Sequence, residues 1–227
     1  MASKRILIPC IDQRERWPTG CESVTAVMLL RYLGIPLSVD EFIRHYLPMR
    51  ELTLFMGADG RTDLTPASEN IIGTGPDPDE YFAGSPYDPA AFGCYPGVLV
   101  RALNRVFAEY APADGCGRPA FAAKDVTGVQ TERLLREYID QGVPVAYWAT
   151  LDLAEPIPGP SWRLDGGELF TWISREHCML LVGYDEERGE LLFNDPWHGL
   201  AAAAYPRELA ERRHAGQGER AAAVRRL

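Results

Sequence analysis

A nearly unbroken apolar segment close to the amino terminus constrains the fold most. Residues 23–33 place apolar side chains on almost every face of a helix, and not along a single stripe. Thr19 and Glu22 have the spacing of a capping box with Thr19 as the N-cap, and Gly34 stands where the helix would end. Because a helix that is apolar all round must be covered on every side, the sequence predicts a central helix around which the rest of the chain folds.

The helix and strand patterns divide the sequence into two unlike halves. Further helices are predicted over residues 38–47 and 98–110, after an extended segment at 6–11. The second half predicts a loop at 155–167, helices at 129–141 and 206–215, and strands at 143–150, 169–173, 177–184, 190–194 and 221–224. Helices followed by strands predict an α+β fold. We expect one domain, residues 1–227, with a helical lobe at about 1–115, an antiparallel β lobe at about 116–227 and a cleft between them.

A proline-rich stretch at residues 60–97 interrupts every periodicity. Loops longer than ~12–15 residues without secondary structure are usually functional or disordered. This stretch carries too many aromatic residues for disorder: Tyr81, Phe82, Tyr87, Phe92 and Tyr95. We therefore expect an ordered loop at the rim of the cleft.

Charge and hydropathy exclude several classes of function. The 227 residues include 32 acidic and 23 basic side chains, giving a net charge of −9, whereas a general nucleic-acid-binding protein has a basic surface. The arginine-rich end alternates with glutamates, which predicts a solvated face. No apolar run approaches the ~18 residues of a membrane-spanning helix, and residues 4–11 lack a cleavage site for a signal peptidase. We expect no nucleic-acid or membrane partner, and a cytoplasmic protein, or a secreted one if a leader has been trimmed.

The cysteines of this chain are widely spaced and form no Cys-x-x-Cys pair, so neither a disulfide framework nor a zinc knuckle is indicated: Cys10, Cys21, Cys94, Cys116 and Cys178. Their odd number leaves at least one free thiol. Cys21 would be the second helical residue after Thr19, where the backbone N–H has no partner in the helix and the helix dipole is positive. Both effects lower the pKa of a thiol. Cys21 is therefore a candidate nucleophile; the alternative is a small buried residue at a helix start.

A nucleophilic thiol needs a base, and the chain has four histidines. We expect His45 and His214 at the surface, whereas His177 opens an apolar strand that forms a hairpin with residues 190–194. With a turn near residues 187–188, paired residue numbers sum to about 374–376, which places Asp195 about one diagonal step from His177. An even sum puts Asp195 on the face of His177 and an odd sum puts Asn194 there; we favour Asp195. The alternative for His177 is a buried histidine with satisfied hydrogen bonds.

Several segments together resemble papain-like cysteine peptidases, and more closely the bacterial branch that includes the double-glycine leader (bacteriocin-processing) peptidases. The matching segments are Gln13 with residues 17–23, residues 30–34, 81–86 and 177–184, and residues 194–196 followed by Gly199. The resemblance implies a papain-like fold with the active site between the two lobes. It also implies that Cys21 attacks an amide carbonyl, that His177 acts as base and then acid, and that Asp195 orients His177. The Gln13 side chain and the Cys21 N–H would form the oxyanion hole.

The same segments supply candidates for substrate binding. Trp17 and Gly20 lie beside Cys21 in the sequence, and Trp172 and Trp197 flank the proposed triad. No metal or organic cofactor is expected, because residues 195–198 with His177 and Cys178 lack a zinc spacing. The leading hypothesis is a thiol hydrolase, a cysteine peptidase acting on a peptide or related amide. The alternatives are an acyltransferase with the same triad and a catalytically silent binding module.

Overall fold

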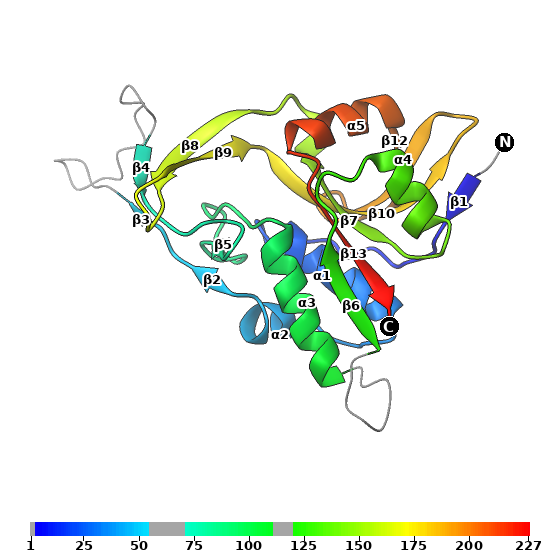
Figure 1. Ribbon diagram of the computed structural model, residues 1–227, viewed down its shortest axis with the longest axis horizontal. Coiled ribbons are helices and arrows are strands. Elements are labelled where there is room, and N and C mark those ends of the chain that lie inside the picture. Colours follow the sequence, from blue (N-terminus) through cyan, green and yellow to red (C-terminus); the bar gives the residue numbers. More distant parts are fainter. Residues whose placement is uncertain (1–2, 55–70, 111–119) are drawn as a thin grey trace.

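The computed structural model describes residues 3–54, 71–110 and 120–227 (Figure 1). Cys116 and residues 60–70 of the predicted rim loop lie outside the described residues. The helices are α1 (Cys21–Tyr32), α2 (Val39–His45), α3 (Pro96–Tyr110), α4 (Thr131–Leu134), which continues as a π-helical turn (Leu135–Ile139), and α5 (Arg207–Gly216), with a 3-10 turn at Leu151–Leu153. The strands are β1 (Ser3–Arg5), β2 (Met49–Arg50), β3 (Thr53–Leu54), β4 (Ile71–Thr74), β5 (Phe82–Ala83), β6 (Phe121–Asp125), β7 (Val145–Thr150), β8 (Ile157–Arg163), β9 (Leu169–Ser174), β10 (Glu176–Asp185), β11 (Glu190–Asp195), β12 (Leu200–Pro206) and β13 (Ala221–Arg226).

Most strands belong to one seven-stranded antiparallel sheet. Its order is β12-β11-β10-β7-β13-β6, and β1 also pairs with β10. A second sheet of β3, β4, β8 and β9 lies at the left of Figure 1, and β2 pairs with β5. Helix α1 packs against β10, α3 against β6 and α5 against β7. Helices combined with mainly antiparallel sheets confirm the predicted α+β class.

The first helix is buried as predicted, but its cap differs. Residues 21–30 are all buried, so α1 forms the centre of the core. The predicted capping box is wrong, because α1 begins at Cys21 with Gly20 as N-cap and no side chain caps it. The Thr19 hydroxyl donates instead to the carbonyl of Asp88 at 2.9 Å, and the Glu22 carboxylate accepts the N–H of Cys94 at 2.6 Å. Both side chains therefore connect the start of α1 to the loop before α3.

The β10–β11 hairpin has the predicted pairing and one irregularity. Next to the turn, Asp185 pairs with Glu190 and Tyr184 with Leu191, an odd sum of 375. A bulge between Leu181 and Gly183 changes the register, so that Leu180 pairs with Asn194, an even sum of 374. The even register at the far end places Asp195 on the same face as His177, because side chains alternate along a strand.

Several strands were not predicted, and three of them, β6, β8 and β12, have an atypical sequence. Residues 155–167 contain β8 instead of a loop, although β8 carries two prolines. Its pairing with β9 is irregular between Pro158 and Ser161. Proline has no backbone N–H to donate, and sheets accept it at such irregularities. Strand β12 is rich in alanine, which favours helix over strand, and β6 lies in a segment without an alternating pattern. The described part of the rim loop is ordered, as predicted, and contributes β4 and β5.

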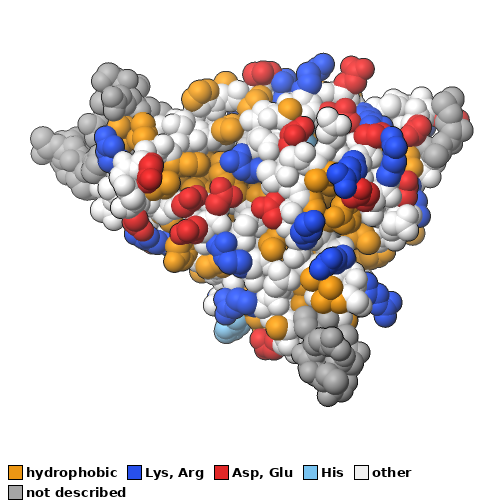
Figure 2. Space-filling view, in the orientation of Figure 1, with side chains coloured by type: hydrophobic (Ala, Val, Ile, Leu, Met, Phe, Trp, Pro, Cys, Tyr) orange, Lys and Arg blue, Asp and Glu red, His pale blue; other side chains and the backbone are white. Residues whose placement is uncertain are grey.

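Charged side chains of both signs are interspersed on the face of the molecule that Figure 2 shows. The arginine-rich end is consistent with this pattern: Arg207 contacts Glu132 at 2.6 Å and Glu211 at 2.8 Å, and Arg213 contacts Glu155 at 2.5 Å. These arginines therefore have local acidic partners. Among the described residues, no helix has the length and apolar character needed to cross a bilayer.

Candidate active site

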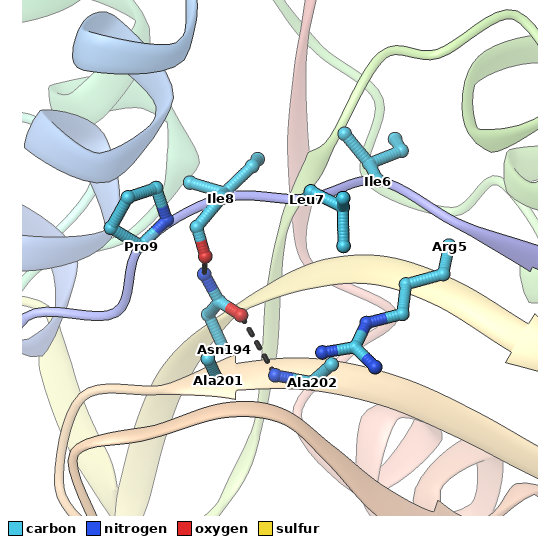
Figure 3. Close-up of a pocket in the computed structure, with 8 residues that line it drawn as sticks. All are labelled: Arg5, Ile6, Leu7, Ile8, Pro9, Asn194, Ala201 and Ala202. Carbon is cyan, nitrogen blue, oxygen red and sulfur yellow. Dashed lines mark hydrogen bonds between the residues drawn. The ribbon is translucent and has the colours of Figure 1, made fainter.

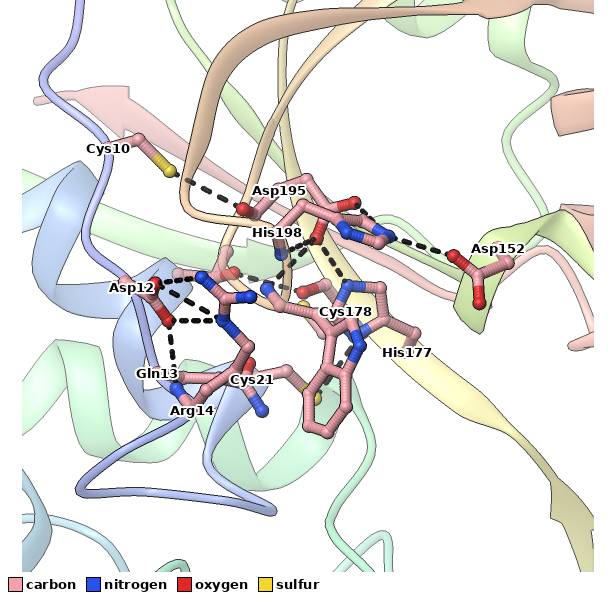
Figure 4. Close-up of polar contacts among 12 residues, drawn as sticks. Cys10, Asp12, Gln13, Arg14, Cys21, Asp152, His177, Cys178, Asp195 and His198 are labelled. Atoms are coloured by element: carbon pink, nitrogen blue, oxygen red, sulfur yellow. Dashed lines mark hydrogen bonds and ion pairs between the residues drawn. The ribbon is translucent and has the colours of Figure 1, made fainter.

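The predicted catalytic residues converge where α1 meets β10. Cys21 is the first residue of α1, His177 is the second residue of β10, and Asp195 is the last residue of β11. The Thr25 hydroxyl of α1 donates to the Cys178 carbonyl of β10 at 3.2 Å, which fixes the helix against the strand. The N–H of Cys178 in turn points to the Cys21 sulfur at 3.5 Å (Figure 4). Cys21 and His177 are only 5 % and 3 % exposed, so both side chains are shielded from solvent.

His177 and Asp195 form a close pair. The His177 Nε2–H donates to Asp195 Oδ1 at 2.9 Å (Figure 4). The N–H of Trp197 donates to the same oxygen at 2.9 Å, and the Tyr205 hydroxyl donates to Oδ2 at 2.5 Å. Burial raises the pKa of Asp195, but the hydrogen bond and charge of His177 and the Tyr205 hydroxyl outweigh it and lower the value to about 2. Asp195 is therefore a carboxylate, and Nδ1 is the His177 nitrogen left for proton exchange.

Asn194 has a different task from Asp195. Its amide nitrogen donates to the Ile8 carbonyl at 2.9 Å and its oxygen accepts the N–H of Ala202 at 2.9 Å (Figure 3). These bonds hold the amino-terminal segment against β12. A cavity of about 370 Å³ lies between the amino-terminal segment and β12. It is lined by Arg5, Ile6, Leu7, Ile8, Pro9, Asn194, Ala201 and Ala202. The Asn194 side chain thus bonds to backbone groups, and Asp195 is the residue that bonds to His177.

The state of the Cys21 thiol differs from the prediction. Burial and the nearby carboxyl groups of Glu22 and Glu176 raise the pKa of Cys21 well above its usual value. The predicted lowering by the helix start is therefore wrong for this arrangement, because desolvation and neighbouring acids dominate. In the absence of substrate, Cys21 is a neutral thiol.

Gln13 lies in the segment that precedes Cys21 and is itself buried. Its backbone N–H donates to the Pro196 carbonyl at 2.9 Å, directly after Asp195. One N–H of its side-chain amide donates to the Pro18 carbonyl at 3.1 Å. Since a primary amide has two such donors, the second remains for another acceptor. The Cys10 thiol adds a further contact from this segment, to the Asp195 carbonyl at 3.5 Å.

The four candidates for substrate binding have distinct environments. Trp17 is buried and its ring N–H donates to Asp40 at 2.9 Å. At Gly20 a Cβ would lie 2.8 Å from the Trp17 Cβ, so only glycine fits. Trp172 is buried and stacks on Tyr95 with ring centroids 5.4 Å apart. Trp197 is half-buried and adjoins the triad through its N–H bond to Asp195. Binding roles for all four remain predictions.

Two predicted surface histidines behave differently. His45 is exposed, as expected. The prediction for His214 is wrong, because its side chain is 2 % exposed and stacks on Tyr147 with centroids 3.7 Å apart. Its Nδ1–H donates to the Trp148 carbonyl at 2.8 Å, and burial lowers the pKa of His214 to about 4. His214 therefore lies neutral between α5 and β7, as part of the core.

Sequence reasoning missed two groups beside the triad. Tyr205 belongs to the unpredicted strand β12, so its contact with Asp195 could not be anticipated. His198 Nε2 contacts Asp152 at 2.8 Å and lies 4.0 Å from Asp195 Oδ2. The short spacing of Asp195 and His198 could be read from the sequence. The contact with Asp152 could not, because Asp152 lies in a turn with a left-handed backbone, φ 56°. Together these groups surround the Asp195 carboxylate.

Potential metal ligands gather at one point of the described chain. Cys21, Glu22 and Glu176 each place a ligand-type atom within 4.8 Å of the other two. The Glu22 oxygens already accept hydrogen bonds from Cys21 and Cys94, which describes a hydrogen-bonded acid cluster. The four described cysteines, Cys10, Cys21, Cys94 and Cys178, are free thiols.

A thiol at the start of a buried helix, packed against a β-hairpin that carries a histidine–aspartate pair, is the arrangement of a cysteine peptidase. The chain belongs to the Peptidase_C39 like family, whose sequence profile matches residues 5–220. Its fold is similar to that of a candidate C39-like peptidase from Bacillus anthracis, with 23% identity, a TM-score of 0.76 and coverage of 100% of this chain and 99% of the other. Xylellain, a cysteine protease from Xylella fastidiosa, matches with 11% identity and a TM-score of 0.41 over 99% of this chain and 86% of its own. No curated protein sequence matches the chain.

Proposed function

We propose that this protein is a cysteine peptidase that cleaves a peptide or related amide bond through a thioester on Cys21. The observation that supports the proposal most is the 2.9 Å His177–Asp195 pair on the β10–β11 hairpin, whose strand β10 packs against Cys21. Membership of the Peptidase_C39 like family supports a peptide substrate. We also propose a papain-like division into lobes of about residues 1–115 and 116–227, with Trp17, Gly20, Trp172 and Trp197 contacting substrate.

The neutral thiol determines how the first step proceeds. His177 Nδ1 takes the thiol proton while Sγ forms a bond to the carbonyl carbon, and the π electrons of the carbonyl move to its oxygen. The free N–H of Gln13 Nε2 and the N–H of Cys21 donate to this oxyanion. When the C–N bond breaks, His177 gives its proton to the leaving amine. Water then attacks the thioester and loses a proton to His177, the C–S bond breaks to release the acid, and His177 returns the proton to the Cys21 sulfur.

Asp195→Asn tests how Asp195 orients His177. The asparagine oxygen can still accept the His177 Nε2–H, so kcat/KM for a cleaved peptide is expected to fall only about tenfold, whereas Asp195→Ala is expected to lose roughly 10²–10³-fold. Equal losses in the two variants would show that charge matters more than orientation.

Asp195 also predicts a pH dependence of stability. Its folded pKa of about 2 lies below the unfolded value of ~3.9. The carboxylate therefore stabilises the fold above about pH 4, and this contribution is lost as the pH falls through about 2. The melting temperature of Asp195→Asn should change less than that of the wild type between pH 4 and pH 2, as measured by circular dichroism. An identical change would contradict the assignment.

An acyltransferase would use the same residues, and the nature of the products distinguishes it. A cleaved peptide is incubated with the enzyme and increasing concentrations of a primary amine such as glycinamide, and the products are identified by mass spectrometry. We expect the free carboxylic acid as the main product at all amine concentrations. If the amide of the added amine replaces the acid as the main product, the enzyme is a transferase.

A further inference from the structure

The Cys21 sulfur is held by groups other than His177. Its S–H donates to Glu22 Oε2 at 3.3 Å, and the sulfur accepts the N–H of Cys178 at 3.5 Å. A sulfur that donates and accepts in this way is a protonated thiol in a fixed orientation. Glu22 is the next residue on α1 and is fully buried, so this contact forms without water.

The Glu22 carboxylate is itself fixed by the loop before α3. Its Oε1 accepts the N–H of Cys94 at 2.6 Å. A Cβ on Gly93 would lie 2.5 Å from this oxygen and 3.3 Å from Glu176 Oε2, so only glycine lets the backbone approach the two acids. The backbone at Gly93 and Cys94 therefore holds the Glu22 carboxylate beside Cys21.

A second acid completes the cluster. Glu176 immediately precedes His177 on β10, and its Oε1 is shielded from solvent without a hydrogen-bond partner. Burial raises the pKa of Glu22 to about 7, and burial together with Glu22 raises the pKa of Glu176 well above its usual value. Two acids this close do not both ionise readily, so Glu176 keeps its proton when Glu22 loses one.

The other titratable or charged groups facing the cluster come from each neighbouring element: Cys94 and Tyr95 from the loop before α3, Arg101 from α3, Cys178 from β10, and Arg220 next to β13. Arg220 opposes the rise in the pKa of Glu176, and its guanidinium stacks 3.6 Å from the Tyr95 ring centroid. Cys94 and Cys178 are neutral thiols, because burial raises the pKa of each.

From this geometry we infer that Glu22, with the neutral Glu176 beside it, is a positioning residue that holds Cys21 as a hydrogen-bonded thiol and sets the pH range in which the nucleophile is available. The inference rests on the proposed role of Cys21 as nucleophile. While Glu22 is protonated, it does not oppose the thiolate. Once Glu22 ionises, its carboxylate lies against the sulfur and disfavours a second negative charge.

The reactivity of Cys21 toward iodoacetamide tests the inference without using turnover. The rate is measured from pH 5 to 9 with EDTA in every buffer, by mass spectrometry of the peptide that contains Cys21. In the wild type we expect the rate to rise with pH up to about 7 and then to level off. Glu22→Gln removes the titrating charge, so its rate should match the wild type within about threefold at pH 5.5 and exceed it by about tenfold or more at pH 8.5.

Two matched variants show whether the charge of Glu22 is responsible. Glu187→Gln changes an exposed glutamate in the β10–β11 turn and should follow the wild type. Glu176→Gln fixes the neutral form that Glu176 already has, and should stay within about twofold of the wild type at pH 8.5. An equal acceleration in Glu22→Gln and Glu176→Gln, or no acceleration in Glu22→Gln, would overturn the inference.

A further measurement needs no Glu22 variant, in case Glu22→Gln fails to fold. In His177→Ala the imidazole cannot produce an inflection, yet the alkylation rate should still level off above about pH 7. A rate that continues to rise tenfold per pH unit to pH 9 would refute the role of Glu22. Because alkylation does not depend on turnover, the inference can fail while the peptidase proposal holds, and the reverse is equally visible.

Discussion

Cys21→Ala is expected to abolish peptide cleavage, lowering kcat/KM by about 10³-fold or more. Removing the nucleophile from a covalent mechanism leaves only the contributions of substrate binding and the oxyanion hole. The measurement is the release of new α-amino groups from a peptide mixture that the wild type cleaves. Cys21→Ser should also be inactive, because the neutral serine hydroxyl is a far weaker nucleophile, and it preserves the shape of the buried site.

Cys10→Ala is the matched control for this experiment. Cys10 is half-buried near the triad, and burial raises the pKa of its thiol to about 12, so it stays protonated and unreactive. Its loss should change kcat/KM by no more than about threefold. Full activity in Cys21→Ala would remove the peptidase proposal and leave a binding module as the better hypothesis.

His177→Gln should produce the second-largest loss, about 10²–10⁴-fold in kcat/KM. The glutamine amide can still donate to Asp195 Oδ1, so the buried hydrogen bond and the fold are retained, but no group remains to take the thiol proton. Because the resting thiol is neutral, this proton transfer cannot be bypassed at neutral pH. The loss should therefore shrink at high pH, where solvent hydroxide deprotonates part of Cys21.

His45→Gln provides the comparison for His177. His45 lies exposed on α2, so its replacement should leave the pH profile of kcat/KM unchanged. Peptide cleavage by His177→Gln at the wild-type rate would show that another group is the base. His198 would then be the next residue to replace, since it lies 4.0 Å from Asp195.

The long-range pairing of the site could be predicted because strand geometry fixes it. The alternation of side chains and the position of one turn brought residues 194 and 195 close to His177, but the choice between Asn194 and Asp195 depends on a bulge at residues 181–183, which has no clear sequence signal. The central helix was equally predictable, since apolar residues on every face permit only burial.

The local chemistry of the site could not be predicted, because it depends on what packs nearby. Cap geometry at Cys21 suggested an acidic thiol, but burial, Glu22 and Glu176 from a distant strand raise the pKa of the thiol. Tyr205 was hidden in an alanine-rich strand. His214 looked exposed among charged residues, yet it follows Ala210 by four positions, and both side chains are buried.

The segment that contains Cys10 and Gln13 has a mechanical consequence. Gln13, the proposed oxyanion donor, bonds to the Pro196 carbonyl, and Cys10 bonds to the Asp195 carbonyl. The segment is therefore attached to the end of β11, where Asp195 contacts His177. If the end of β11 moves, Gln13 must move with it. Proton transfer by His177 and stabilisation of the oxyanion by Gln13 are therefore gained or lost together. An intermediate state with a working base but no stabilised oxyanion is thereby avoided.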